Sequence, residues 1–305
     1  MNQRQIIASN LKFPEGPIWM ADGSVILVEI ARGTLTRVFN GVTEVIADLG
    51  GGPNGAAIGP DGQCYVCNNG GFIWHEKNGR LYPGEQPESY QGGSIQRVNL
   101  LSGNTETLFT ECDGIPLKGP NDLVFDRSGG FWFTDHGKTQ ARTRDRTGLF
   151  YVTPGCSSIK EAFFPLDGPN GVGLSPDEQE LYVAETGPGR VWAFPLSAPG
   201  QLQDDGRARR LLRDRGGWHM YDSLAVDCQG GICVASLIDG GIATLYPDGR
   251  EPAFYPTQDN LTTNICFGGA DLDRAFITLS SQGLLLETPW HVPGHPLNFG
   301  HQGSD

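Results

Sequence analysis

The sequence lacks any run of about 18 or more apolar residues, so it predicts no membrane-spanning helix. Residues 1–8 lack the apolar segment of a secretory signal peptide, which favours a cytoplasmic protein. Positive charge is also scarce, because 22 Lys and Arg residues stand against 35 Asp and Glu residues, for a net charge of −13. Nucleic acids select basic surfaces. We therefore expect neither a nucleic acid nor a membrane as partner.

Cysteine is too scarce and too scattered to indicate a disulfide framework or a zinc site. The seven cysteines are an odd number. Cys64 and Cys67 have the spacing of a metal-binding pair, but they fall in a predicted strand, where residues three apart point to opposite faces. No second pair of Cys or His residues completes a tetrahedral zinc site. We expect reduced, mostly buried thiols.

Signals for helices and for a serine nucleophile are missing as well. The sequence contains no Gly-x-Ser-x-Gly motif. Its 44 glycines and 21 prolines stand between short apolar runs and leave no capped stretch of helical period longer than a turn or two. This pattern predicts turn-rich, all-β structure.

What the sequence does contain is one repeated motif, which begins at Pro14-Glu15-Gly16 and returns five more times. Each copy has a polar residue, an apolar tripeptide, an Asp- or Gly-rich turn and then a short β-rich run. A period of roughly 40–50 residues with several short strands is typical of a β-propeller blade. Six copies fill the chain and predict one domain, residues 1–305, folded as a six-bladed propeller. The polar residue, called the pivot below, is in successive copies Glu15, Asn54, Asn121, Asn170, Asp222 and Asn264.

Equivalent positions of a propeller lie at one height around its axis, so the pivots are expected to face one another across a central channel. Glu15, Asn121, Asn170 and Asp222 would then offer oxygen ligands alone, which select Ca²⁺, Mg²⁺ or Mn²⁺. The alternative is that these residues cap turns and bind water. That explanation suits asparagine but not Glu15 beside two prolines. We therefore expect the channel to hold one divalent cation.

Such a cation can polarise a carbonyl and activate a water molecule, which suits hydrolysis of a lactone, an ester or a phosphoester. Asp222 is the expected catalytic base, because it can bind the ion and accept a proton. His219 and His136 are candidates for the same task. The long excursion over residues 68–94 is expected to overhang one mouth of the channel as a loop without a strand pair. The expected substrate-binding residues are Asn54, Lys118, Asn121, Asp135 and His219.

These motifs together resemble the SMP-30/gluconolactonase family of regucalcin-like lactonases over essentially the whole chain. The residues that carry the resemblance are Phe13-Pro14-Glu15-Gly16-Pro17, Gly119-Pro120-Asn121-Asp122, Trp132-Phe133-Thr134-Asp135, Pro169-Asn170-Gly171, Leu181-Tyr182-Val183, Asn264-Ile265-Cys266-Phe267-Gly268-Gly269 and Ala275-Phe276-Ile277-Thr278.

The resemblance implies a divalent cation bound by Glu15, Asn170 and Asp222, with Asn121 on the substrate side and sometimes a ligand. It implies hydrolysis of sugar-acid lactones, with Asp222 as the base. Ca²⁺ is the expected ion, and Mg²⁺, Mn²⁺ and Zn²⁺ stay open. The chain departs from the family pattern at Tyr221-Asp222-Ser223, where relatives have Pro-Asp-Gly. It also has Gly119, two residues before Asn121, where some lactonases have an arginine. Lys118 or a loop residue would then take the role of that arginine.

Three functions stay open at this point. The first is a metal-dependent sugar-acid lactonase acting on a small lactone as a monomer or weak homo-oligomer. The second is a phosphotriesterase-like or arylesterase-like hydrolase that uses the same metal site. The third is a non-catalytic propeller that binds calcium or a protein. A polar channel mouth favours the first, and an apolar mouth with histidine favours the second.

Overall fold

The computed structural model describes residues 4–300 and shows the expected all-β chain. Within these residues the helical segments are two short 3₁₀ turns, η1 (Pro154–Cys156) and η2 (Gln203–Gly206). No helix in this part of the chain is long and apolar enough to cross a membrane. The prediction of turn-rich β-structure is confirmed.

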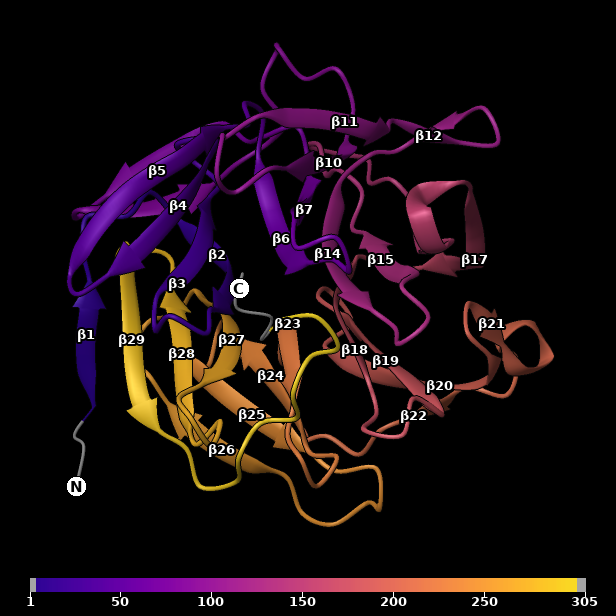
Figure 1. Ribbon diagram of the computed structural model, residues 1–305. Helices are drawn as coiled ribbons and strands as arrows, with labels where there is room; N and C mark the ends of the chain where they lie inside the picture. The colour runs from indigo at the N-terminus through magenta and orange to yellow at the C-terminus, as the bar shows by residue number, and fades with distance from the viewer. Residues whose placement is uncertain (1–3, 301–305) are drawn as a thin grey trace.

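Six antiparallel sheets stand around a common axis as the blades of a propeller (Figure 1). Each blade begins with an innermost strand beside the axis, and every pivot residue lies in one of these strands, at or near its start. The six-bladed ring predicted from the repeat is confirmed. The innermost strands are β2 (Pro14–Trp19), β6 (Pro53–Ile58), β14 (Pro120–Phe125), β18 (Pro169–Leu174), β23 (Tyr221–Val226) and β27 (Thr262–Gly268).

The remaining strands of each blade follow outward from the axis. In the first three blades they are β3 (Val25–Glu29), β4 (Thr34–Phe39) and β5 (Val42–Asp48); β7 (Cys64–Asn68), β10 (Ser94–Val98) and β11 (Thr105–Phe109); and β15 (Phe131–Asp135), β16 (Thr147–Val152) and β17 (Ile159–Leu166). In the last three they are β19 (Glu180–Glu185), β20 (Arg190–Ala198) and the short β21 (Gln201–Leu202) and β22 (Arg210–Leu211); β24 (Ile232–Ser236), β25 (Gly241–Leu245) and β26 (Ala253–Pro256); and β28 (Arg274–Leu279), β29 (Leu284–Pro289) and β1 (Gln5–Ala8).

The Asp residues of the repeat form the turns between the first and second strands. In five blades the carboxylate accepts a hydrogen bond from the backbone N–H two residues later, for example Asp22 from Ser24 at 2.9 Å and Asp177 from Gln179 at 3.0 Å. This local hydrogen bond closes an Asx turn. The turn therefore fixes where each second strand starts.

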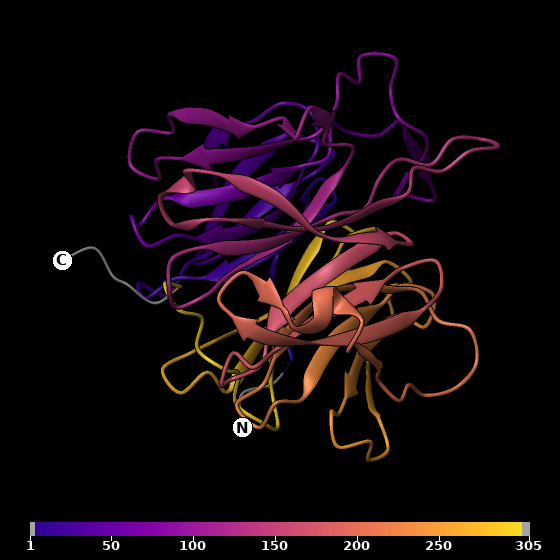
Figure 2. The same ribbon diagram turned by 90° about the vertical axis from the view of Figure 1, so that its right-hand side faces the viewer.

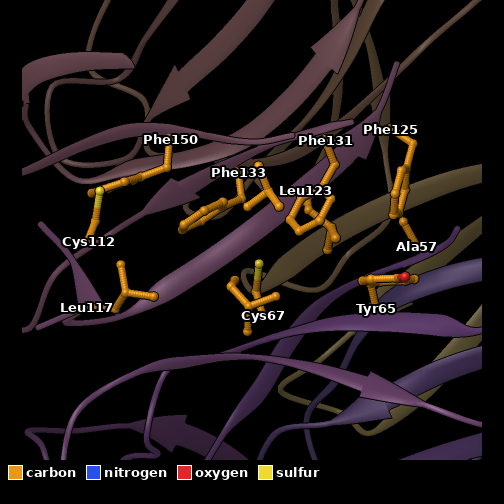
Figure 3. Packing of buried hydrophobic residues seen from close by; sticks show 12 residues of the cluster. Ala57, Tyr65, Cys67, Cys112, Leu117, Leu123, Phe125, Phe131, Phe133 and Phe150 are labelled. Carbon is orange, nitrogen blue, oxygen red and sulfur yellow. The ribbon is translucent and has the colours of Figure 1, made fainter. Parts of the chain in front are cut away.

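The hydrophobic core is divided into six clusters, one between each pair of neighbouring blades. Figure 3 shows the cluster between the second and third blades, where Phe125 and Phe131 pack toward Tyr65. Cys67 belongs to this cluster, whereas Cys64 lies in the cluster on the other face of β7. The prediction that these two thiols point apart is confirmed. No cysteine forms a disulfide, and five of the seven are buried.

Glycine follows three of the pivots, Glu15, Asn54 and Asn170, because the innermost strands approach closely near the axis. A Cβ atom on Gly55 would lie 2.5 Å from the carbonyl oxygen of Asn121, and one on Gly171 would lie 2.7 Å from that of Asp222. These contacts are with backbone atoms, which cannot rotate away. Glycine at this position therefore allows one pivot to stand beside the next.

The ring is closed by the two ends of the described chain. β1 pairs with β29 in antiparallel fashion, so the last blade takes its outermost strand from the N-terminal part of the chain (Figure 1). Ala8 and Leu11 carry this closure into the cluster between the sixth and first blades. β1 therefore completes the last blade and does not start the first.

The excursion over residues 68–94 contains a strand pair, which the sequence analysis did not predict. β8 (Trp74–Lys77) and β9 (Arg80–Pro83) form an antiparallel hairpin joined by Asn78-Gly79. Both turn residues have positive φ, 54° and 71°, as a tight hairpin of this kind requires. The hairpin was missed because its polar strands lie outside the core. A second small hairpin joins β12 (Glu111–Cys112) to β13 (Ile115–Pro116).

Candidate metal and substrate site

Five of the six pivots line one cavity of about 240 Å³ at the axis of the ring. They come from five blades and are Glu15, Asn54, Asn121, Asn170 and Asp222. The β8–β9 hairpin covers part of the mouth, because Leu81 donates its backbone N–H to the Ser281 carbonyl of the sixth blade at 3.0 Å. In Figure 2 this excursion leaves the side of the ring opposite the yellow segment that follows β29. The expectation that it overhangs one mouth is confirmed.

Glu15 is buried, and its two carboxylate oxygens have different surroundings. Oε2 accepts hydrogen bonds from the side-chain Nδ2 of Asn264 at 2.6 Å and from the backbone N–H of Gly16 at 2.5 Å. Oε1 is buried without a hydrogen-bond partner. The sixth pivot, Asn264, therefore orients the carboxylate of the first and leaves one oxygen free at the axis.

Asn170 and Asn121 present amide oxygens to the same region. The Nδ2 group of Asn170 donates to Thr186 Oγ1 at 3.0 Å, which turns its Oδ1 the other way, toward Ser223 Oγ at 3.4 Å. Asn121 is buried, and its Oδ1 has no partner. A buried polar atom without a partner costs on the order of 1–3 kcal/mol. Two such oxygens at one axis call for a ligand.

The carboxylates of the channel are held close together in a poorly solvated place. Burial raises the pKa of Glu15 well above its ordinary value, and the negative charge of Asp222 raises it further. Burial also raises the pKa of Asp222 to about 7, against the opposing effect of a hydrogen bond with Asn170. The same cause raises the pKa of the neighbouring Asp122 to about 7. Negative charge is therefore unfavourable here unless a cation balances it.

The donor set fits a hard divalent cation. Among residues 4–300 no group of three or more His, Cys, Asp or Glu side chains is arranged to hold a metal. The cluster combines two carboxylates with two amide oxygens instead, and oxygen donors of this kind are those that Ca²⁺ and Mg²⁺ prefer. Two carboxylates balance two positive charges. The residues that would hold the ion are Glu15, Asn121, Asn170 and Asp222.

A sequence model of the SMP-30/gluconolactonase/LRE-like region matches residues 13–281. The chain belongs to this family.

Two relatives of this chain are named lactonases. A gluconolactonase of Zymomonas mobilis is 27% identical over 297 residues, which cover 87% of this chain and 75% of the relative. The drp35 lactonase of Staphylococcus saprophyticus is 30% identical over 189 residues, which cover 61% of this chain and about half, 52%, of the relative.

Solved structures with the same architecture include a regucalcin and a gluconolactonase. A calcium-binding regucalcin of Agrobacterium tumefaciens has a TM-score of 0.75 at 19% identity, with 97% of each chain covered. A gluconolactonase of Xanthomonas campestris has a TM-score of 0.73 at 23% identity, covering 95% of this chain and 89% of that one. These likenesses establish the fold of this family member.

Asp135 is placed outside the cavity lining, which differs from its expected part in substrate binding. Its carboxylate accepts three backbone N–H groups, those of Lys118 and Gly119 at 2.7 Å and that of Gly137 at 2.8 Å. Glu29, Asn68 and Glu185 occupy the same position in other blades and accept backbone N–H groups in the same way. Asp135 therefore fixes the loop that enters the third blade.

Lys118 and His219 also lie outside the cavity lining. The Lys118 backbone is held by Asp135 and by the Tyr90 hydroxyl, which donates to its carbonyl at 2.6 Å. The His219 ring has an acceptor at each nitrogen, Asp239 Oδ2 at 2.6 Å and the Gly216 carbonyl at 2.9 Å. Neither side chain has the free polar group in the cavity that substrate binding requires.

The cavity includes polar residues to which the sequence analysis gave no place in the site. Lys138, which follows β15, lines it together with Asn69 from the excursion and Thr186 from the fourth blade. His136, a candidate base in the sequence analysis, lines it as well. The sequence offers one indication of Lys138. It comes three residues after Asp135, which ends β15 on the side of the blade that carries the pivots. A rule that searches only the pivot position does not find it.

Proposed function

We propose that this chain is an enzyme that hydrolyses the lactone of a sugar acid with the help of one divalent cation, Ca²⁺ in the first place. The proposal is supported chiefly by the two unpartnered oxygens, on Glu15 and Asn121, that face a cavity lined by five pivots. It is also supported by the names of the lactonase relatives. A cation held by Glu15, Asn121, Asn170 and Asp222 would supply Lewis acidity for the lactone carbonyl and for a water molecule.

The side chains of the cavity have separate tasks in this proposal. Asp222 is partly exposed to the cavity and accepts the proton of the water that attacks the lactone carbonyl. Ser223 holds this carboxylate by donating its backbone N–H at 3.1 Å. The amides of Asn121 and Asn54 provide hydrogen bonds for the hydroxyl groups of the sugar.

The test is a pH-indicator assay of lactone hydrolysis with the metal-free protein and with its Ca²⁺, Mg²⁺, Mn²⁺ and Zn²⁺ forms. Asp222→Ala should lower kcat by at least about 100-fold, the usual effect of losing a positioned base, and should weaken metal binding. Asp177→Ala is the matched control, because it removes the carboxylate of an exposed turn in the neighbouring blade, outside the cavity lining. Full activity of Asp222→Ala would overturn the role assigned to this carboxylate.

A second function has one observation in its favour. Apolar side chains also line the cavity, among them Phe13, Phe72 and Leu261, and His136 lies beside them. An aryl ester or a phosphotriester would suit these side chains and the same metal. The assay above therefore includes phenyl acetate and paraoxon, and faster hydrolysis of either than of any sugar lactone would favour this second function.

A further inference from the structure

One positively charged residue of the cavity lining, Lys138, is buried. This side chain is 4% exposed and lines the cavity. Its Nζ atom donates to Asn69 Oδ1 at 3.1 Å and to the Gly71 carbonyl at 2.8 Å. It also lies 4.1 Å from the ring centre of Phe72. An ammonium group has three N–H donors, so one of them is left without a protein acceptor.

No carboxylate of residues 4–300 forms an ion pair with Lys138. The negative charges that act on it are those of Asp135 and Asp145. The first is already bound by three backbone N–H groups, and the second accepts the backbone N–H of Lys138 itself at 3.0 Å. A buried cation whose partners are a neutral amide, a carbonyl and aromatic rings is under-compensated.

Asn69 beside it also has an unused donor. Its Oδ1 accepts from the backbone N–H of Gly71 at 2.8 Å as well as from Lys138 Nζ, and these two donors fix the orientation of the amide. The Nδ2 group is then left buried without a partner, on a residue that is 3% exposed and lines the cavity. Lys138 and Asn69 thus form a pair of adjacent donors, which we call the donor pair.

The rest of the cavity has the opposite character. Glu15 and Asp222, with the amide oxygens near them, are the acceptor side and suit a cation. The donor pair suits a group with two acceptor oxygens and a negative charge, because such a group supplies one oxygen to each donor and balances the ammonium. A hydroxyl group of a neutral sugar satisfies one donor and leaves the charge uncompensated.

We propose that Lys138 and Asn69 bind a carboxylate of the substrate, so that the preferred substrate is a sugar lactone that also carries a free carboxylate. This inference rests on the proposed lactonase function and specifies its substrate class. The acceptor side then faces the lactone ring, while the donor pair holds the acid group at the other end of the molecule. Both loops that supply the donor pair, the excursion and the segment after β15, belong to the same mouth of the channel (Figure 2).

The test compares two lactones that differ in one group, D-glucaro-1,4-lactone with a carboxylate and D-glucono-1,4-lactone with a hydroxymethyl group. The wild-type protein should give the higher kcat/KM with the first. Lys138→Met keeps the length of the side chain and removes its charge. It should lower the ratio of the two kcat/KM values by about 10- to 100-fold, as expected for one charge-assisted hydrogen bond, mainly through the KM of glucarolactone. Lys118→Met should keep the wild-type ratio.

Asn69→Asp provides a second variant that retains the contacts of Oδ1. Its new carboxylate pairs with Lys138 and occupies the donor pair, so the preference for glucarolactone should be lost here too. A wild-type preference for gluconolactone, or an unchanged ratio in both variants, would overturn the proposal.

Equilibrium binding of glucarate and gluconate, measured by calorimetry, separates this inference from the proposed function. Glucarate should bind the wild-type protein more tightly than gluconate does, and Lys138→Met should remove the difference. If the wild-type protein hydrolyses neither lactone but shows this binding pattern, the lactonase function fails and the carboxylate site stands. If it hydrolyses both lactones and binds the two anions equally, the carboxylate site fails and the lactonase function stands.

Discussion

At the scale of single residues, the site combines groups whose burial would destabilise the protein on its own. Glu15 contributes a carboxylate with one unpartnered oxygen, and Lys138 contributes an ammonium group without a carboxylate partner. Such groups are rare in protein interiors because their desolvation is unfavourable. Their occurrence in the lining of one cavity suits a bound cation near Glu15 and an anionic group of the substrate near Lys138.

Lys138 makes the stability of the protein depend on pH in a defined way. Burial lowers the pKa of Lys138 to about 7, and the charges of Asp135 and Asp145 oppose this shift. In the unfolded chain the lysine has its ordinary pKa of about 10.4. Between these values the unfolded state binds a proton that the folded state does not, so the free energy of unfolding rises with pH. Below about pH 7 both states are protonated and the full unfavourable effect of burial is present.

Lys138→Met should therefore be more stable than the wild-type protein at pH 6, by an amount on the order of a few kcal/mol at about 1.4 kcal/mol per pKa unit. The difference should shrink steadily toward pH 10. Urea unfolding at constant ionic strength over this range measures it, with Lys118→Met as control. A difference that does not change with pH would show that Lys138 keeps its ordinary pKa in the folded protein.

The pivots and the donor pair differ in how far the sequence reveals them. The pivots could be found because the repeat places Glu15, Asn170 and Asp222 at one offset, and a ring converts equal offsets into proximity. The same argument does not distinguish a substrate-binding Asp135 from a structural one, because a carboxylate at the end of a strand accepts backbone N–H groups of the next loop as readily as it binds a ligand. Asn69 and Lys138 belong to loops, whose conformation no repeat specifies.

At the scale of elements, the β8–β9 hairpin connects distant blades over the mouth of the channel. Besides the hydrogen bond from Leu81 to Ser281, Arg80 donates to Asn260 Oδ1 at 3.3 Å and lies 4.0 Å from the carboxylate of Asp259. At its base, Trp74 packs on the ring of Phe13 with 4.9 Å between centroids. The hairpin contributes to none of the six clusters between blades. The hairpin therefore covers the site and does not contribute to the hydrophobic core of the ring.

Shortening the hairpin tests this division. Deletion of Glu76, Lys77, Arg80 and Leu81 removes two cross-strand pairs, so the Asn78-Gly79 turn joins His75 to Tyr82, a pair of the same hydrogen-bonding type. The contacts to the sixth blade are lost. Since each lost hydrogen bond contributes about 1 kcal/mol, the KM for the lactone should rise about fivefold or more, with a small effect on the free energy of unfolding.

Leu81→Ala is the matched control, because it retains the backbone N–H that reaches Ser281 and should retain the wild-type KM. Steady-state kinetics and urea unfolding give the two measurements. Global destabilisation of the shortened protein with an unchanged KM would mean that the hairpin supports the ring.

The elements of the ring were predictable because their strands are apolar and periodic, whereas those of the hairpin are not. Asn40-Gly41 can be recognised in the sequence as a hairpin turn because alternating strands flank it, and both residues have positive φ, 50° and 76°. Asn78-Gly79 is the same dipeptide in a polar setting. Without a buried face, β8 and β9 lack the alternation that marks a strand.

At the scale of the whole molecule, the ring is held together by packing between blades, and the pivots meet at its axis. The six clusters give every blade two neighbours, and β1 closes the circle by pairing with β29. The proposed cation ligands come from the first, third, fourth and fifth blades. One ion would thus join parts of the chain that are more than 200 residues apart, as Glu15 and Asp222 are.

The cation should consequently stabilise the folded ring as a unit. A ligand that binds only the folded state at about 100 times its Kd adds about 2.7 kcal/mol to the free energy of unfolding, which corresponds to a rise in Tm on the order of 5 °C or more for a chain of this size. Differential scanning calorimetry with EDTA and with graded Ca²⁺ measures this rise.

Glu15→Gln removes one of the two balancing charges but keeps the size of the side chain. It should abolish most of the Ca²⁺-dependent rise while leaving the Tm in EDTA at or above the wild-type value, because an uncompensated buried carboxylate is removed. A large fall in the Tm of Glu15→Gln in EDTA would mean that the pivots hold the ring together directly, and an equal Ca²⁺-dependent rise in both proteins would place the ion elsewhere.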